Sequence, residues 1–276
     1  MHDTKTGTLP VPGASLYYEV RGSGPLLLIA QGGDGNAARG ADLADRLAAD
    51  HTVVTYDRRG LSHSTLDDPT TPVTVATHAD DAHRLLAALT DEPAYVFGSS
   101  FGALLGLTLA AAHPDQVHTL VAHDPATFRL LAPEGRDRAT RDLDILEDLF
   151  RDQGTLPALA KLSELVEADF SDREPDVPMP TPPGPERLAD LEFFFRNDLP
   201  QLRAAELDAG HIATLTSRVV PAAGQKSRRL WNYDCAQALA SLLDTDVTEF
   251  PGGHSLSTHP AAFTTRLREV LNPRSS

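Results

Sequence analysis

The sequence predicts an α/β protein with a mostly parallel sheet, helices on both faces of that sheet and one inserted block of helices. Three observations support this prediction. Short apolar or β-branched runs alternate with helical patterns over residues 1–126 and again over residues 211–276. Between residues 127 and 210 only helical patterns occur. Several of the short runs end in glycine-containing turns, which are typical of strand ends.

Strands and helices alternate in the first part of the chain. Residues 9–11 and 15–20 flank the turn former Pro12-Gly13, which suggests a hairpin. Residues 52–56 are rich in β-branched side chains and predict a strand, whereas residues 103–112 are almost wholly apolar and predict a buried helix. The remaining strands are expected at residues 25–30, 94–97 and 117–122, and the remaining helices at residues 41–49 and 75–89.

The pattern changes after residue 126. Helices are expected at residues 138–151, 156–170, 186–197 and 199–209. Residues 174–185 contain six prolines, and because proline lacks a backbone donor we expect a stiff extended segment there. Later strands are expected at residues 218–223 and 247–250, and later helices at residues 233–243 and 260–271. Since the sheet pattern continues on both sides, we interpret residues 1–126 and 211–276 as one core domain and residues 127–210 as its cap.

The composition is that of a globular protein with an acidic surface. The chain has 276 residues, of which 41% are hydrophobic, and a formal net charge of −15. Because an acidic surface repels nucleic-acid backbones and anionic lipids, we expect neither as a partner, but rather a small-molecule substrate and a monomer or homodimer. The single cysteine, Cys235, excludes an internal disulfide and a cysteine-based zinc cluster. No signal peptide and no apolar run of about 20 residues is visible, so we expect a cytoplasmic protein.

The segment Gly98-Ser99-Ser100-Phe101-Gly102 has the G-x-S-x-G pattern of a nucleophile turn. A sharp turn from strand to helix exposes the central side chain, and glycines permit the close approach of backbones that such a turn needs. We therefore predict that Ser100 is a catalytic nucleophile at a helix N-terminus. The free backbone N–H of Phe101 would then be one donor to a developing oxyanion. A glycine-rich helix start without chemistry is the alternative interpretation.

A serine nucleophile needs a neighbouring base, and His254 is the best placed of the eleven histidines. It follows the last expected strand, at the carboxyl edge of the sheet, where the sites of α/β proteins lie. Solvent exposure is expected instead for His63, His78, His83, His113 and His118.

The acid that orients the base is expected between Ser100 and His254 in the sequence. Its usual position is the loop after the strand at residues 218–223, but that loop holds no carboxylate and has Ser227 where an acid is expected. Asp124 leaves the same edge of the sheet at the end of the preceding strand, where it can orient the imidazole. We predict Asp124 as the acid and keep Asp234 as its main competitor.

The loop Gln31-Gly32-Gly33-Asp34-Gly35 follows an expected strand and is predicted to supply the second oxyanion donor. The backbone N–H of Gly33 is the first choice and that of Asp34 the second. Gln31, Gly32 and Asp34 are expected to border the substrate. A plain glycine turn is the alternative interpretation.

These segments together resemble those of the α/β-hydrolase superfamily, and the chain is most similar to its small actinobacterial members. The resemblance covers nearly the whole chain. It rests on the loop at residues 31–35, the turn Asp57-Arg58-Arg59-Gly60, the turn at residues 98–102 and the segment Pro251-Gly252-Gly253-His254. It implies an eight-stranded sheet and a Ser–His–acid hydrolase that uses no cofactor and no metal and has a helical cap over its pocket.

Ser100 and His254 carry over directly from this resemblance, and residues 57–60 carry over as a structural turn without a catalytic role. The chain departs from the family pattern at two places. The oxyanion loop usually reads His-Gly, where this chain has Gln31-Gly32. The usual acid is absent, so Asp124 corresponds to a minority arrangement within the superfamily.

The cap is expected to choose the substrate because it lines the pocket. Its predicted helices offer apolar side chains at Leu143, Leu146, Phe150, Leu162, Leu165, Phe170, Phe193, Phe194 and Phe195. Those not needed for packing would suit an ester, lactone or thioester with a small hydrophobic body. Three alternatives stay open: acyl transfer or cyclisation, C–C bond cleavage by the same residues, and ligand binding with little turnover.

Overall fold

The computed structural model describes residues 3–33 and 35–272, and this part of the chain contains one sheet of nine strands. The strands are β1 (Thr4–Val11), β2 (Ala14–Gly22), β3 (Leu26–Ala30), β4 (Thr52–Tyr56), β5 (Thr65–Leu66), β6 (Ala94–Ser99), β7 (Val117–His123), β8 (Val219–Gly224) and β9 (Thr248–Phe250). Their order is β1-β2-β4-β3-β6-β7-β8-β9, and β5 pairs with β2. The six strands from β4 to β9 in this order pair in parallel, whereas β1, β2 and β5 pair antiparallel. The mostly parallel sheet is thus confirmed, and the two-residue β5 adds to the eight expected strands.

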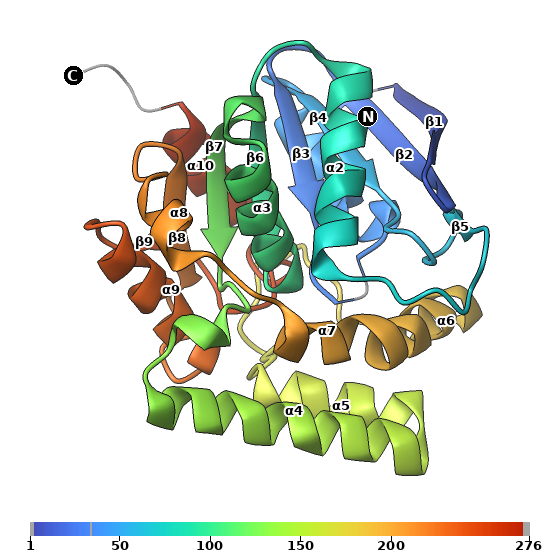
Figure 1. The fold of residues 1–276 in the computed structure, drawn as a ribbon, viewed down its shortest axis with the longest axis vertical. Helices are drawn as coiled ribbons and strands as arrows, with labels where there is room; N and C mark the ends of the chain where they lie inside the picture. The colour runs from blue at the N-terminus through green and yellow to red at the C-terminus, as the bar shows by residue number, and fades with distance from the viewer. Residues whose placement is uncertain (1–2, 34, 273–276) are drawn as a thin grey trace.

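Helices cover both faces of the sheet and one of its ends (Figure 1). They are η1 (Ala37–Gly40), α1 (Ala41–Leu47), α2 (Val75–Leu89), α3 (Phe101–Ala112), η2 (Pro114–Gln116), η3 (Phe128–Leu130), α4 (Pro133–Gln153), α5 (Thr155–Leu165), α6 (Pro185–Phe193), the π-helical turn η4 (Phe194–Asp198), α7 (Leu199–Ala204), α8 (Ala209–Ala213), α9 (Trp231–Leu242) and α10 (Pro260–Leu271). Helices α2, α3 and α9 pack on one face and α1 and α10 on the other.

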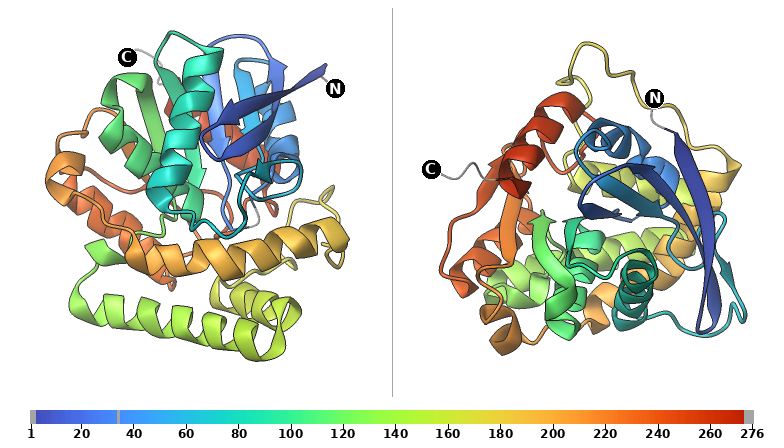
Figure 2. Two further views of the ribbon diagram at one scale, coloured as in Figure 1. Left: turned by 45° about the vertical axis from the view of Figure 1, so that its right-hand side comes forward. Right: turned by 90° about the horizontal axis from the view of Figure 1, so that it is seen from above.

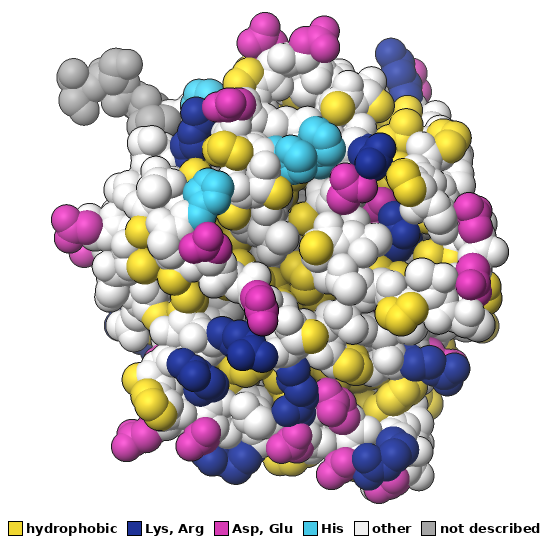
Figure 3. Space-filling model, in the orientation of Figure 1, with side chains coloured by type: hydrophobic (Ala, Val, Ile, Leu, Met, Phe, Trp, Pro, Cys, Tyr) yellow, Lys and Arg dark blue, Asp and Glu magenta, His cyan; other side chains and the backbone are white. Residues whose placement is uncertain are grey.

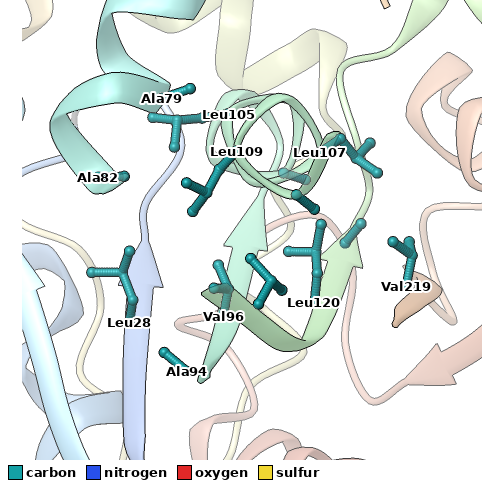
Figure 4. Packing of buried hydrophobic residues seen from close by; sticks show 14 of the residues in the cluster. Leu28, Ala79, Ala82, Ala94, Val96, Leu105, Leu107, Leu109, Leu120 and Val219 are labelled. Carbon is teal, nitrogen blue, oxygen red and sulfur yellow. The ribbon is translucent and has the colours of Figure 1, made fainter. Parts of the chain in front are cut away.

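The largest core cluster lies between the sheet and α2 and α3 (Figure 4). Leu28 and Val96 from neighbouring strands meet Leu105 and Leu109 from α3, and none of these four side chains is accessible to solvent. Helix α3 is therefore buried over most of its surface, as its apolar sequence predicts. This packing fixes the start of α3, and with it Ser100, relative to the carboxyl ends of the strands.

The helices from α4 to α7 lie across the carboxyl end of the sheet, where β3 and β7 point towards them (Figures 1 and 2). Two of these helices end earlier than predicted. Helix α5 ends at Leu165, because Glu167 takes a left-handed conformation with φ of 47°. Helix α7 ends at Ala204, because Ala205 is extended. The helix expected at residues 186–197 is divided into α6 and the π-helical turn η4.

The proline-rich residues 174–184 form no helix or strand, as expected, but their first residue is held in place. The Glu174 carboxylate accepts hydrogen bonds from the backbone N–H groups of Ala261 and Ala262, in the first turn of α10. The Glu174 N–H donates to the Thr258 carbonyl. Since free N–H groups at a helix start attract a carboxylate, these contacts tie the proline-rich segment to the loop that carries His254.

Acidic and basic side chains are interspersed over α4 on the face shown in Figure 3. Short-range pairs such as Arg151 with Asp148 account for part of this pattern. In the described part of the chain, no helix has both the length and the apolar character needed to cross a membrane.

Candidate active site

Ser100 occupies the sharp turn between β6 and α3 that the sequence predicts. Its backbone has φ of 55° and ψ of −117°, a conformation that is costly for any residue with a side chain. The turn depends on the glycines around it, because a Cβ at Gly98 would overlap the backbone of Gly102, and a Cβ at Gly102 would overlap the Ala30 carbonyl. The strained serine therefore stands at the N-terminus of a buried helix, next to the free N–H of Phe101.

His254 and Asp124 meet although 130 residues separate them in the sequence. The distance between His254 Nδ1 and Asp124 Oδ2 is 3.2 Å. Asp124 is inaccessible to solvent and lies directly after β7, with φ of 43°. His254 lies in the loop after β9 and borders the same cavity as Ser100. No hydrogen bond joins the described side chains of Ser100 and His254, and such bonds often form only when substrate is bound.

Ser227 fills the position where the family usually has its acid, and it contacts Asp124. The Ser227 hydroxyl donates to Asp124 Oδ2 over 2.6 Å, and the Gly224 N–H donates to Asp124 Oδ1 over 3.2 Å. The side-chain amide of Asn232 donates to the Asp124 carbonyl. The sequence analysis missed Asn232, because nothing in the pattern of α9 distinguishes this residue from its neighbours.

The environment of Asp124 keeps its carboxyl group ionised. Burial alone would raise the pKa of Asp124, but His123, His254 and Ser227 outweigh it and lower this pKa. Burial also lowers the pKa of His123 to about 4, so that imidazole is neutral at pH 7. The hydrogen bonds from Ser227, Gly224 and His254 therefore stabilise the charge at neutral pH.

The competing acid, Asp234, has a different partner. Its carboxylate pairs with Arg138 of α4 at 2.9 Å, and both side chains are about two-fifths exposed. Among the described contacts of Asp234, none reaches His254. The geometry thus favours Asp124 over Asp234 as the partner of the imidazole.

The predicted oxyanion loop lies beside Ser100. A Cβ built on Gly32 would lie 3.5 Å from the Ser100 Cβ, so the two backbones are close. Gln31, Gly32 and Gly33 all border the cavity, and the backbone carbonyls of these three residues accept hydrogen bonds from the guanidinium of Arg58. Asp34, the remaining predicted residue of this loop, lies outside the described residues.

A cavity of about 700 Å³ contains Ser100 and His254. Most of its wall is apolar. The helices over the sheet end contribute Leu143, Leu146, Leu159, Leu162, Phe194, Leu199 and Leu202, and Phe170 lines it from the segment after α5. The other predicted candidates, Phe150, Leu165, Phe193 and Phe195, do not line it. Phe195 instead stacks on Phe150 inside the helical block, which consists of the helices from α4 to α7. Charged side chains of Arg39, Asp42, Arg46, Asp176 and Arg187 lie along another part of the wall.

His78 is buried, so the expectation from the sequence that it is exposed was wrong. Only 1% of this residue is accessible, and its Nε2 lies 3.1 Å from the carboxylate of Asp198. The partner comes from the π-helical turn η4, 120 residues further along the chain, so the pattern of α2 alone gave no sign of it.

The described residues include no group of three or more histidine, cysteine, aspartate or glutamate side chains arranged to hold a metal ion.

Comparison with known proteins identifies the family. Residues 25–200 match the family described as the alpha/beta hydrolase fold. The chain belongs to the α/β-hydrolase family. It is 39% identical over 270 residues to "Uncharacterized hydrolase YraK" of Bacillus subtilis (strain 168), covering 96% of this chain and 95% of that protein.

A more distant relative is the 2-(acetamidomethylene)succinate hydrolase of Mesorhizobium japonicum, with 32% identity over 164 residues, 59% of this chain and 54% of that protein. Solved structures show the same fold. An esterase from Thermogutta terrifontis superposes with a TM-score of 0.75 and 18% identity over 98% of each chain. The enol-lactonase from Burkholderia xenovorans LB400 superposes with a TM-score of 0.72 and 21% identity, over 96% of this chain and all of that one. The family and the relatives named as hydrolases identify this chain as a hydrolase.

Proposed function

We propose that this α/β hydrolase is a serine hydrolase that cleaves a carboxylic ester, lactone or thioester of a small hydrophobic substrate. One observation carries the proposal: His254, paired with the buried Asp124, borders the cavity that is also lined by Ser100 on its strained turn. A hydroxyl, a buried carboxylate and an imidazole in this chain order are the parts of a Ser–Asp–His triad.

In the first half-reaction, Ser100 Oγ attacks the carbonyl carbon while His254 Nε2 takes the hydroxyl proton. The C=O double bond becomes an oxyanion, which the N–H groups of Phe101 and Gly33 would stabilise. The intermediate collapses to an acyl-enzyme, the bond to the leaving oxygen or sulfur breaks, and the imidazolium returns its proton to that atom. Asp124, held ionised by Ser227, stabilises the imidazolium throughout.

In the second half-reaction, water takes the place of the serine hydroxyl. His254 accepts a proton from this water, which attacks the acyl carbon, and the proton then returns to Ser100 as the free acid leaves. Residues 127–210 would act as a cap that excludes bulk water from these steps, because their helices lie over the carboxyl end of the sheet.

The cavity wall and the solved structures with the same fold support the proposed substrate class. Leucine and phenylalanine side chains from the helical block favour an apolar acyl or alcohol group. The names of the esterase and the enol-lactonase that share the fold indicate that those two proteins act on esters and lactones. Gln31 and Gly32 border the cavity beside Ser100 and are proposed to contact the substrate.

Two measurements on one set of variants test the proposal. The wild type should hydrolyse p-nitrophenyl butyrate, and Ser100→Ala should lower kcat by at least about 10⁴-fold. A fluorophosphonate should label the wild type at Ser100, as mapped by peptide mass spectrometry. The neighbouring variant Ser99→Ala serves as the matched control and should still be labelled at Ser100.

Other outcomes would change the assignment. Equal rates for the wild type and Ser100→Ala would remove the serine mechanism. A transferred or cyclised product instead of the free acid would assign an acyl transferase, and a cleaved carbon chain would assign a C–C hydrolase. Tight binding of esters with no labelling of Ser100 would assign a binding protein.

A further inference from the structure

Arg58 is a buried cation at the oxyanion loop, and the proposed mechanism above does not use it. Only 2% of this residue is accessible to solvent. Its Nη1 donates to the carbonyls of Gln31 and Gly32 over 3.0 Å and 2.7 Å, and its Nη2 donates to the carbonyl of Gly33 over 2.7 Å. One planar guanidinium therefore holds three consecutive carbonyl groups, which a lysine ammonium cannot do in the same geometry.

This clamp sets the direction of the predicted oxyanion donor. In a planar trans peptide the C=O and the following N–H point in opposite directions. Since the Gly32 carbonyl points at Arg58, the N–H of Gly33 points away from Arg58. Gly32 lies against Ser100 on the side that borders the cavity. A shift of the guanidinium would therefore turn the N–H of Gly33.

Arg58 is held in turn by Asp198, which belongs to the π-helical turn of the helical block. Arg58 Nη2 lies 3.0 Å from Asp198 Oδ2, and His78 Nε2 lies 3.1 Å from Asp198 Oδ1. Asp198 is inaccessible to solvent. Burial alone would raise the pKa of Asp198, but His78 and Arg58 outweigh burial and lower this pKa, so the carboxylate stays charged.

The same π-helical turn places Phe194 against Gly33 and against the side chain of Phe101. The Phe194 ring packs against Gly33, where an added Cβ would come within 3.0 Å of the ring. It also meets the Phe101 ring edge-on, with centroids 6.4 Å apart. The Arg58 guanidinium lies 5.0 Å from the centroid of that Phe101 ring. Single π-helical turns within helices are found frequently at functional sites, and this one directs two side chains to the oxyanion loop.

Stability alone is a poor explanation for this arrangement. Burying an ion pair costs much of what the attraction gains, and apolar residues often replace such pairs without loss. Arg58 Nε is buried and has no hydrogen-bond partner among the described residues, which adds to the cost. A functional demand on the position of the guanidinium would account for a costly group beside the nucleophile.

We propose that Arg58, Asp198 and His78 are positioning residues that hold the N–H of Gly33 in the oxyanion hole, so that the helical block completes this hole. The proposal rests on the serine hydrolase function proposed above. It predicts a defect in the transition state with little change in ground-state binding.

Two variants test it against one matched control. Asp198→Asn removes the charge that holds Arg58, and Arg58→Lys keeps a charge near Asp198 but loses the clamp on three carbonyls. The control is Asp81→Asn, which breaks the neighbouring buried pair of Arg59 and Asp81 with the same change of charge. Neither Arg59 nor Asp81 is hydrogen-bonded to residues 31–33 in the described chain.

For p-nitrophenyl butyrate, each test variant should lose about 10- to 100-fold in kcat, with KM within about threefold of the wild type. Inhibition by an alkylboronic acid, whose tetrahedral adduct on Ser100 occupies the oxyanion hole, should weaken by the same factor as kcat/KM falls. Asp81→Asn should keep the wild-type kcat and boronate affinity, and its thermal unfolding shows how much a broken buried pair costs in stability.

Unchanged kcat in a folded Asp198→Asn or Arg58→Lys protein would overturn the proposal. So would an equal loss of kcat in Asp81→Asn, or a fall in kcat without a matching loss of boronate affinity. If Asp198→Asn does not fold, Arg58→Lys decides. A wild type that neither hydrolyses the ester nor binds the boronate at Ser100 would withdraw the proposed function as well, which separates that failure from failure of the positioning role alone.

Discussion

His123 should make the stability of this protein depend on pH in a window where few side chains titrate. It is inaccessible to solvent, and neither of its ring nitrogens has a hydrogen-bond partner in the part of the chain that the structure describes. Its ring packs against Phe97, Phe250 and Phe263. Burial lowers the pKa of His123 to about 4; the Asp124 carboxylate acts against this shift and the His254 imidazole adds to it. The folded state therefore resists protonation at this position, whereas the unfolded chain accepts a proton near pH 6.5.

The sign and the size follow from these two pKa values. Above pH 6.5 the imidazole is neutral in both states, and the stability associated with it is fully present. As the pH falls towards 4, only the unfolded state binds the proton, so this stability is lost. A difference between 6.5 and about 4, at about 1.4 kcal/mol for each pH unit, amounts to about 3 kcal/mol.

Urea unfolding at half-unit steps between pH 4 and pH 7.5 measures this term. The variant His123→Leu replaces the imidazole with an apolar side chain, and its free energy of unfolding should fall by about 3 kcal/mol less than that of the wild type between pH 6.5 and pH 4. Phe250→Leu is the matched control, because it changes packing beside the same ring but leaves the imidazole in place. For Phe250→Leu, the free energy of unfolding should be lower than that of the wild type at every pH, and it should change with pH in the same way.

Parallel curves for the wild type and His123→Leu would refute this reasoning. They would mean that the folded protein accepts the proton at an ordinary pKa, through water entry or a rearrangement that gives the ring a partner.

Three further outcomes follow from single contacts. Asp124→Asn should lower kcat by about 10³- to 10⁴-fold, and adding Ser227→Asp should recover at least about tenfold, because the two side chains lie 2.6 Å apart beside the imidazole; steady-state kinetics decide. Glu174→Ala removes the carboxylate at the start of α10, so it should cost about 1 kcal/mol in urea unfolding and speed proteolysis within residues 175–184. Gly102→Ala should cost about 3 kcal/mol or more, since the methyl group would overlap the backbone of β3; a thermal melt like that of the wild type would contradict this.

The order of the eight longer strands and of most of the helices was predictable because these elements carry their own signals. Strands end at glycine-containing turns, and α3 is apolar on every side. The same local signals place Ser100 and Asp124 directly after strands and His254 in the loop after the last strand. Since the carboxyl ends of parallel strands share one edge of the sheet, their approach could be expected before any distance was known.

The contacts between the helical block and the sheet domain could not be predicted in this way. Arg58 was predicted only as part of a structural turn and His78 as an exposed residue of a helix. Both contact Asp198, which lies 140 and 120 residues away from them in the sequence. Helical periodicity sets which side of a helix is apolar, but it does not say where that helix docks. It also does not distinguish a π-helical turn from an α-helical one, so η4 was hidden within an ordinary helix prediction.

The hydrogen bond between Ser227 and Asp124 bears on how the acid can change position during evolution. A chain with carboxyl groups at both positions would hold them too close for both to be ionised. One carboxyl group would therefore keep its proton and donate a hydrogen bond to the other, as the serine hydroxyl does here. His254 would stay oriented in that intermediate. The two arrangements of the acid are therefore connected by single substitutions, and no ancestor along that path would have to lose its activity.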